Sequence, residues 1–298
     1  MARNIASPKY PSPAEELTSF LGLIIRAPLL STLALHFIVG PIYYAYFSTL
    51  PYNSSIVFAV SLTVAHIVVF TVAHSFFCAL DKFKLLQRHK LPRNETQTNS
   101  AELIRNTLLE EIINMLLVSP VLAGLYHYYV LTRPDKSAPL QKFGANFLHF
   151  IGATMWNEIL FYAAHRTLHE WPVLYQAIHK KHHMYKGTIS IAAEWASPIE
   201  SLFASTIPTV GYMFLVQAET PLIATWLLVR LWETYESHSG YCFKNTLLAK
   251  IGLLNSYGAE FHDFHHRNNI GNYGAPYLDY LFGTQDSFLQ YQQSLKQK

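Results

Sequence analysis

Residues 56–80 read IVFAVSLTVAHIVVFTVAHSFFCAL, a run without a single Lys, Arg, Asp or Glu. A helix needs about 20 mostly apolar residues to cross the hydrocarbon core of a bilayer. This run is therefore expected to form a membrane-spanning helix. The composition of the chain agrees, since 51% of its 298 residues are hydrophobic and only 14% are charged, against roughly 25% charged residues in ordinary soluble domains.

Further apolar runs predict an all-α integral membrane protein with about four transmembrane helices. The expected spans lie at about 29–50, 56–80, 107–131 and 145–164. Two later apolar runs, at about 199–217 and 220–235, predict a helical hairpin that enters the membrane and returns to the same side, with Pro221 at its turn. Because no internal repeat or low-complexity stretch divides the chain, residues 1–298 are expected to form a single domain.

The segment 81–106 sets the expected orientation, because it carries six Lys and Arg residues. Basic loops of membrane proteins stay in the cytosol. Counting spans from this loop places every histidine cluster that follows 145–164 on the cytosolic side, beneath the membrane helices. Asn94, which begins an Asn-Glu-Thr acceptor pattern, should then carry no glycan.

Charge and cysteine content exclude two classes of function. The net charge of +3 is small, and the basic residues form no single stripe, so no nucleic-acid partner is expected. The two cysteines, Cys78 and Cys242, form neither a disulfide framework nor a Cys-x-x-Cys pair. Any metal ion is therefore expected to be held by nitrogen or oxygen.

Histidine is the unusual residue type, since nine of the fifteen histidines lie in four clusters. HRTLH places two imidazoles four residues apart, on one face of a helix. HKKHH and HDFHH each place one histidine at helical spacing from two others, whose adjacent side chains diverge by about 100°. The fourth cluster is a single histidine in ETYESHSGY. The nine candidate ligands are His165, His169, His179, His182, His183, His238, His262, His265 and His266.

Nine imidazoles exceed the four ligands of a tetrahedral zinc site, so two metal ions are predicted. Imidazole suits iron, zinc, copper and nickel alike, but oxidation of a lipid C–H bond in a membrane requires a redox metal, which favours iron. Ligating imidazoles usually donate their second N–H to a carboxylate or carbonyl. The acidic candidates for this role are Glu158, Glu194, Glu200, Glu233, Glu236 and Asp263.

The other six histidines are expected to be ordinary core or surface residues. Two of them, His66 and His74, lie within an expected span. An ionisable side chain at that depth is by itself a functional hint.

The histidine spacings over residues 157–284 resemble the membrane fatty acid hydroxylase and sterol desaturase superfamily. HRTLH, HKKHH, ETYESHSGY and FHDFHHRNNIGNYG followed by YLFGT are most similar to its methylsterol monooxygenase branch, which oxidises a sterol C-4 methyl group. The resemblance implies that the nine histidines bind two iron ions in a cytosolic helical cap, with a catalytic region at about 145–284. It also implies O2 as oxidant, electrons from NAD(P)H through cytochrome b5 and its reductase, and a multi-pass location in the endoplasmic reticulum membrane.

Three departures from the family pattern leave the substrate open. His169 is followed by Glu170 where paired histidines are common, residues 197–200 read Ser-Pro-Ile-Glu, and Thr234 stands where fatty acid hydroxylases tend to carry a histidine. A tenth metal ligand would then be water or another side chain. A desaturase and a fatty acyl or other lipid hydroxylase remain alternatives, and a membrane zinc hydrolase or a metal carrier are more distant ones.

Overall fold

The computed structural model describes residues 13–93, 99–130, 140–244, 246–250, 254 and 258–296. Within these residues the chain is helical, and the feature nearest to a strand is an isolated bridge between Lys90 and Tyr241. The predicted all-α class is confirmed. Asn94 lies outside the described residues, so its expected lack of a glycan stays a prediction.

The first half of the chain forms three long helical segments. They are α1 (Pro13–Ala34), which continues through a π-helical stretch (Leu35–Val39), α2 (Gly40–Ile42) and a second π-helical stretch (Tyr43–Phe47), then α3 (Ser54–Lys82) and α4 (Ala101–Val130). A short 3-10 turn covers Gln87–His89. The Asn53 side chain accepts a hydrogen bond from the Ser55 N–H at 2.8 Å, and this N-cap begins α3 directly after the short connection that the sequence predicted.

Three helices among the described residues are long and apolar enough to cross a membrane: Ile24–Phe47, Ser54–Lys82 and Ala101–Tyr126. They match the first three spans expected from the sequence. Apolar side chains such as Val72, Leu116 and Leu117 point outward and are more than half exposed, as suits a surface that faces lipid. The fourth expected span falls in α5 (Phe143–Glu170), which has the length but carries polar residues along it.

The expected hairpin is present as a pair of helical segments. The first consists of α7 (Pro198–Glu200), a π-helical stretch (Ser201–Thr206) and α8 (Ile207–Leu215), and the second is α9 (Thr220–Ser237). Pro221 lies in the first turn of α9, where its missing N–H costs no helical hydrogen bond. Phe58, Phe150, Met213 and Trp226 form part of the core that holds this pair against α3 and α5.

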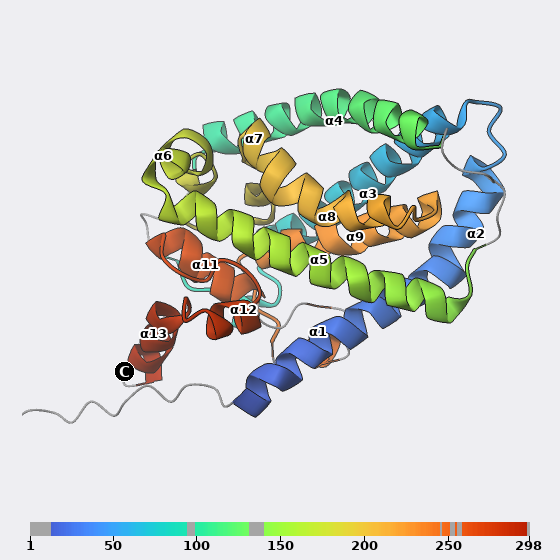
Figure 1. The fold of residues 1–298 in the computed structure, drawn as a ribbon. Coiled ribbons are helices and arrows are strands. Elements are labelled where there is room, and N and C mark those ends of the chain that lie inside the picture. The colour runs from blue at the N-terminus through green and yellow to red at the C-terminus, as the bar shows by residue number, and fades with distance from the viewer. Residues whose placement is uncertain are drawn as a thin grey trace, which may run out of the picture.

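The remaining elements are short, and three of them carry clustered histidines. They are α6 (Pro172–Leu174), a π-helical turn (Tyr175–His179), two 3-10 turns (His182–Met184 and Ser190–Glu194), α10 (Leu247–Lys250), α11 (Gly258–Asn268), α12 (Pro276–Leu281) and α13 (Asp286–Lys296). Figure 1 shows α6 and α11 beside the end of α5 that carries HRTLH. The fold thus brings distant histidine segments to one end of the helical base.

Candidate metal centre

All nine predicted ligand histidines come together, in two adjoining groups. Within each group, one ring nitrogen of every histidine lies within 4.8 Å of all the others. The first group is His165, His169, His179, His183 and His265, and the second is His182, His238, His262 and His266. The two groups lie next to each other. The ring centre of His183 in the first group is 5.8 Å from that of His182 in the second.

Local helical geometry sorts adjacent histidines into different groups. In α11, His262 and His266 lie one turn apart and join the second group, whereas His265 joins the first. In HKKHH, a π-helical turn ends at His179 and a 3-10 turn begins at His182, and again the adjacent pair divides. Side chains of adjacent residues point about 100° apart in an α-helix and about 120° apart in a 3-10 turn, which explains why one short segment can serve both groups.

The inner ring nitrogens face one another at short range. The Nε2 atoms of His165 and His179 are 3.1 Å apart, and those of His238 and His262 are 2.8 Å apart. His265 Nε2 is buried and has no hydrogen-bond partner among the described residues, a costly state for a polar atom. Two neutral imidazoles cannot both direct a lone pair at the same point unless a cation lies there. The donor set therefore fits a bound metal ion in each group.

Six of the rings donate their outer Nδ1–H to an acceptor on the side away from the group. The acceptors are backbone oxygens for His165 (Tyr273, 2.6 Å), His182 (Trp195, 3.2 Å), His238 (Thr234, 2.8 Å), His265 (Gly271, 2.6 Å) and His266 (Tyr185, 3.1 Å), and Glu200 Oε1 for His179 (2.7 Å). These bonds select the tautomer in which Nε2 is free to bind metal. Sequence reasoning missed the carbonyl acceptors because every residue has a carbonyl, so no residue type marks them.

The six acidic candidates differ in the partners that their carboxylate groups contact. Glu200 accepts the hydrogen bond from His179, whereas Asp263 is fully buried in ion pairs with Arg93 at 2.6 Å and Arg267 at 3.0 Å. Those arginines fix α11 rather than a histidine ring. Of the six candidates, Glu200 alone contacts a ring nitrogen of the nine among the described hydrogen bonds.

The other four carboxylates make no described hydrogen bond to the nine rings. Glu158 accepts from the Asn157 amide at 3.2 Å, and Glu233 pairs with Arg230 at 3.3 Å. Glu194 accepts from the Tyr235 hydroxyl. Glu236 is buried at the end of α9, where its backbone oxygen accepts from the Ser239 N–H at 3.0 Å. Their predicted role as partners of ligand histidines stays a prediction.

Burial keeps the imidazoles in the neutral form that binds metal. Desolvation lowers the pKa of His182 to about 4 and the pKa values of His165 and His238 to about 3. The same cause holds the pKa values of His265 and His266 well below the usual range. Protons therefore compete poorly for these nitrogens at neutral pH.

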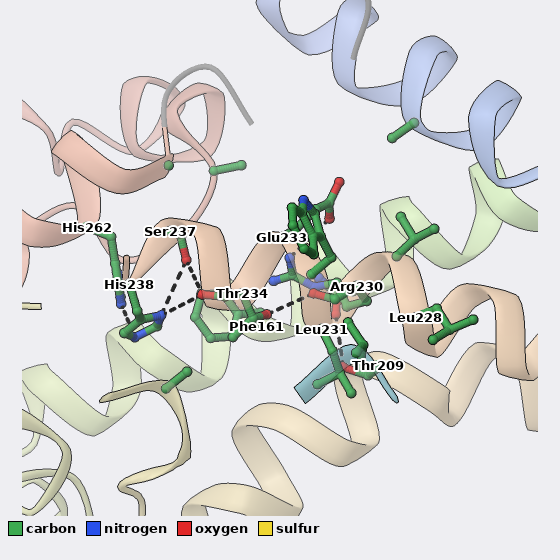
Figure 2. A pocket seen from close by; sticks show the side chains of 18 of the residues that line it. Phe161, Thr209, Leu228, Arg230, Leu231, Glu233, Thr234, Ser237, His238 and His262 are labelled. Atoms are coloured by element: carbon green, nitrogen blue, oxygen red, sulfur yellow. Dashed lines mark hydrogen bonds and ion pairs between the residues drawn. The ribbon is translucent and has the colours of Figure 1, made fainter. Parts of the chain in front are cut away.

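A cavity of about 1220 Å³ extends from the histidine groups between α1, α3, α5 and α9. It is larger than the roughly 300–1,000 Å³ of most small-molecule sites. Figure 2 shows His238 and His262 at one end and Leu228 further along α9, with the Arg230–Glu233 ion pair between them. A long, mostly apolar molecule would fit this space with one end at the histidines.

Residues 150–284 match the family described as fatty acid hydroxylase. The match supports the superfamily that the histidine spacings resemble. Both histidine groups lie wholly within the matched region. No solved structure matches the chain.

Several proteins similar to this chain are named methylsterol monooxygenases, which confirms the resemblance to that branch. Methylsterol monooxygenase 1 of Gallus gallus is 31% identical over 183 residues, covering 60% of this chain and 60% of its own length. Methylsterol monooxygenase 2-2 of Arabidopsis thaliana is 29% identical over 231 residues, covering 75% and 84%. The very-long-chain aldehyde decarbonylase GL1-8 of Oryza sativa subsp. indica is 38% identical over 137 residues, covering 44% and 49%. The chain spans about half to three fifths of the length of several curated relatives that it matches.

Proposed function

We propose that this protein is a membrane di-iron monooxygenase that hydroxylates a sterol or sterol-like lipid, with a sterol C-4 methyl group as the candidate position. The observation that carries the proposal is the placement of two imidazole groups in the wall of one large, mostly apolar cavity. The similarity to proteins named methylsterol monooxygenase supports the sterol class of substrate. The oxidant would be O2, and the electrons would come from NAD(P)H through cytochrome b5 and its reductase.

The two groups would each hold one iron ion, the first through five imidazoles and the second through four. When bound, iron would supply the redox chemistry by which one oxygen atom of O2 enters a C–H bond, while the other leaves as water with two electrons from NAD(P)H. The protein contributes the fixed ring orientations, because each outer Nδ1–H that is bonded to a carbonyl or to Glu200 leaves Nε2 facing the centre of its group.

The cavity would position the lipid. Leu228, Leu231 and Phe161 form part of the wall and would bury the apolar body of the substrate, which also excludes water from the reacting carbon. The Arg230–Glu233 pair offers both a donor and an acceptor to a lipid hydroxyl group. A sterol held in this way would place one end against His238 and His262.

The proposed setting is the endoplasmic reticulum membrane, with the histidine groups on the cytosolic side. This orientation follows from the basic segment 81–106 and the positive-inside rule. It would let cytosolic cytochrome b5 approach the cap that carries both groups.

Lipid profiling of cells that lack the protein tests the substrate class, and incubation of the purified protein with the accumulated lipid, NADH, cytochrome b5, its reductase and 18O2 tests the reaction. We expect a methylated sterol to accumulate and the product to carry one labelled oxygen atom. A desaturated product without added oxygen would indicate a desaturase, and an accumulated fatty acyl lipid or fatty aldehyde would replace the sterol assignment. Turnover of a lipid without oxygen consumption would favour a zinc hydrolase and overturn the proposal.

A further inference from the structure

A third group of metal-ligand side chains lies outside the nine histidines. His66 Nε2 on α3 is 3.5 Å from Glu111 Oε1 on α4 and 3.8 Å from Glu194 Oε1 at the end of the 3-10 turn Ser190–Glu194. The three ligand atoms all lie within 4.8 Å of one another. The Tyr235 hydroxyl on α9 is 3.1 Å from His66 Nε2 and also donates to Glu194 Oε1.

The two carboxylates of this group are buried beside each other. The side chain of Glu111 is 4% exposed and that of Glu194 is 14% exposed. Among the described residues, His66 is the basic group in ion-pair range of either one, because neighbouring Glu110 pairs with Lys181 and the His74 ring bonds to Ser190. Burying two carboxyl groups side by side is costly unless protons or a cation offset their charge. A divalent cation would offset both charges at once.

The spacing of the donor atoms fits one ion. Metal–ligand bonds of about 2.0–2.2 Å in a tetrahedral site separate the ligand atoms by about 3.3–3.6 Å. The distances from His66 Nε2 to Glu111 Oε1 and Glu194 Oε1 are 3.5 and 3.8 Å. They resemble the 2.8 to 3.4 Å between Nε2 atoms of the second histidine group. Mixed imidazole and carboxylate donors suit divalent ions such as Zn²⁺.

We propose that His66, Glu111 and Glu194 form a third site for a divalent cation, separate from the two histidine groups. The site joins α3 and α4 to the turn that ends at Glu194, and the Tyr235 hydroxyl ties α9 to the same carboxylate by a hydrogen bond. The next residue is Trp195, whose carbonyl oxygen accepts the hydrogen bond from His182 Nδ1. The third cation would therefore hold the backbone that orients one ligand of the second histidine group, so its role is positioning.

Metal counting tests the site without any activity measurement. The full chain, purified in detergent, is saturated with Zn²⁺ and desalted, and bound zinc is measured by mass spectrometry. We expect three ions per chain in the wild type and two in Glu111→Gln and His66→Gln. Glu102→Gln, which makes the same change at an exposed position in the first turn of α4, should retain three ions.

The number of zinc ions per chain distinguishes the third site from the proposed oxygenase centre. Two ions in the wild type, unchanged in Glu111→Gln but reduced to one by His265→Ala, would overturn the third site and leave the two-metal centre intact. A single ion in the wild type that is lost in Glu111→Gln and retained in His265→Ala would support the third site and contradict the two-metal centre. If both third-site variants fail to fold, the wild-type count still decides, because two ions contradict the proposal and three support it.

Discussion

Replacing Glu200 by Gln tests whether a buried carboxylate strengthens metal binding through His179. Its Oε1 accepts from His179 Nδ1 at 2.7 Å, and the two side chains are 7% and 1% exposed. Burial raises the pKa of the Glu200 carboxyl group, whereas a cation bound to His179 would favour the carboxylate. A hydrogen bond to a charged group contributes about 1.5–3 kcal/mol and a neutral one about 0.5–1.5 kcal/mol.

Gln keeps an acceptor oxygen but loses the charge, so we expect a loss of about 1–1.5 kcal/mol, or about tenfold weaker binding of one metal ion. Ala removes the acceptor as well, and we expect Glu200→Ala to weaken binding by about 10–100-fold. The assay is the metal retained by each purified variant after incubation with graded concentrations of a chelator.

Glu158→Gln is the matched control, because Glu158 is also a buried carboxylate beside the cavity but receives its hydrogen bond from Asn157. Its metal retention should equal that of the wild type. Equal losses in Glu158→Gln and Glu200→Gln would refute the reasoning, as would full retention in Glu200→Ala.

Three further outcomes are expected. His182→Ala or His265→Ala should abolish product formation, while His89→Ala, which lies outside both groups, should leave most activity; equal losses at equal protein level would remove the distinction. Asn94 should carry no glycan in expressed protein, as mass mapping would show, and a glycan there would place the histidine groups on the lumenal side. Chelated protein should become acid-labile, because burial lowers the pKa of His182 to about 4 whereas an unfolded histidine titrates near about 6.5. The unfolded chain then binds more protons as the pH falls through this window, so stability present above pH 6.5 is lost towards pH 4; equal melting temperatures of chelated protein at pH 7 and pH 5 would contradict this.

The membrane helices and the nine clustered histidines were predictable from the sequence because both signals are local. A span is a continuous apolar run such as 56–80, and neither its length nor its lack of charge depends on the rest of the fold. The division of HDFHH between two groups follows from the angle between adjacent helical side chains. The apolar run at 145–164 did not separate a span from a buried helix, because α5 has the length of a span but carries Asn157 and Glu158 within it.

The tertiary structure decided which groups meet across long separations. The carbonyl of Tyr273 orients His165 from 108 residues away, and no residue type marks a backbone oxygen for that task. His66, Glu111, Glu194 and Tyr235 likewise come from four separate segments. Helical periodicity relates side chains only within a few turns, so such a group has no spacing that a sequence can display. Local chemistry could be read directly from the chain, whereas the contacts that orient the ligands arise only when the helices pack.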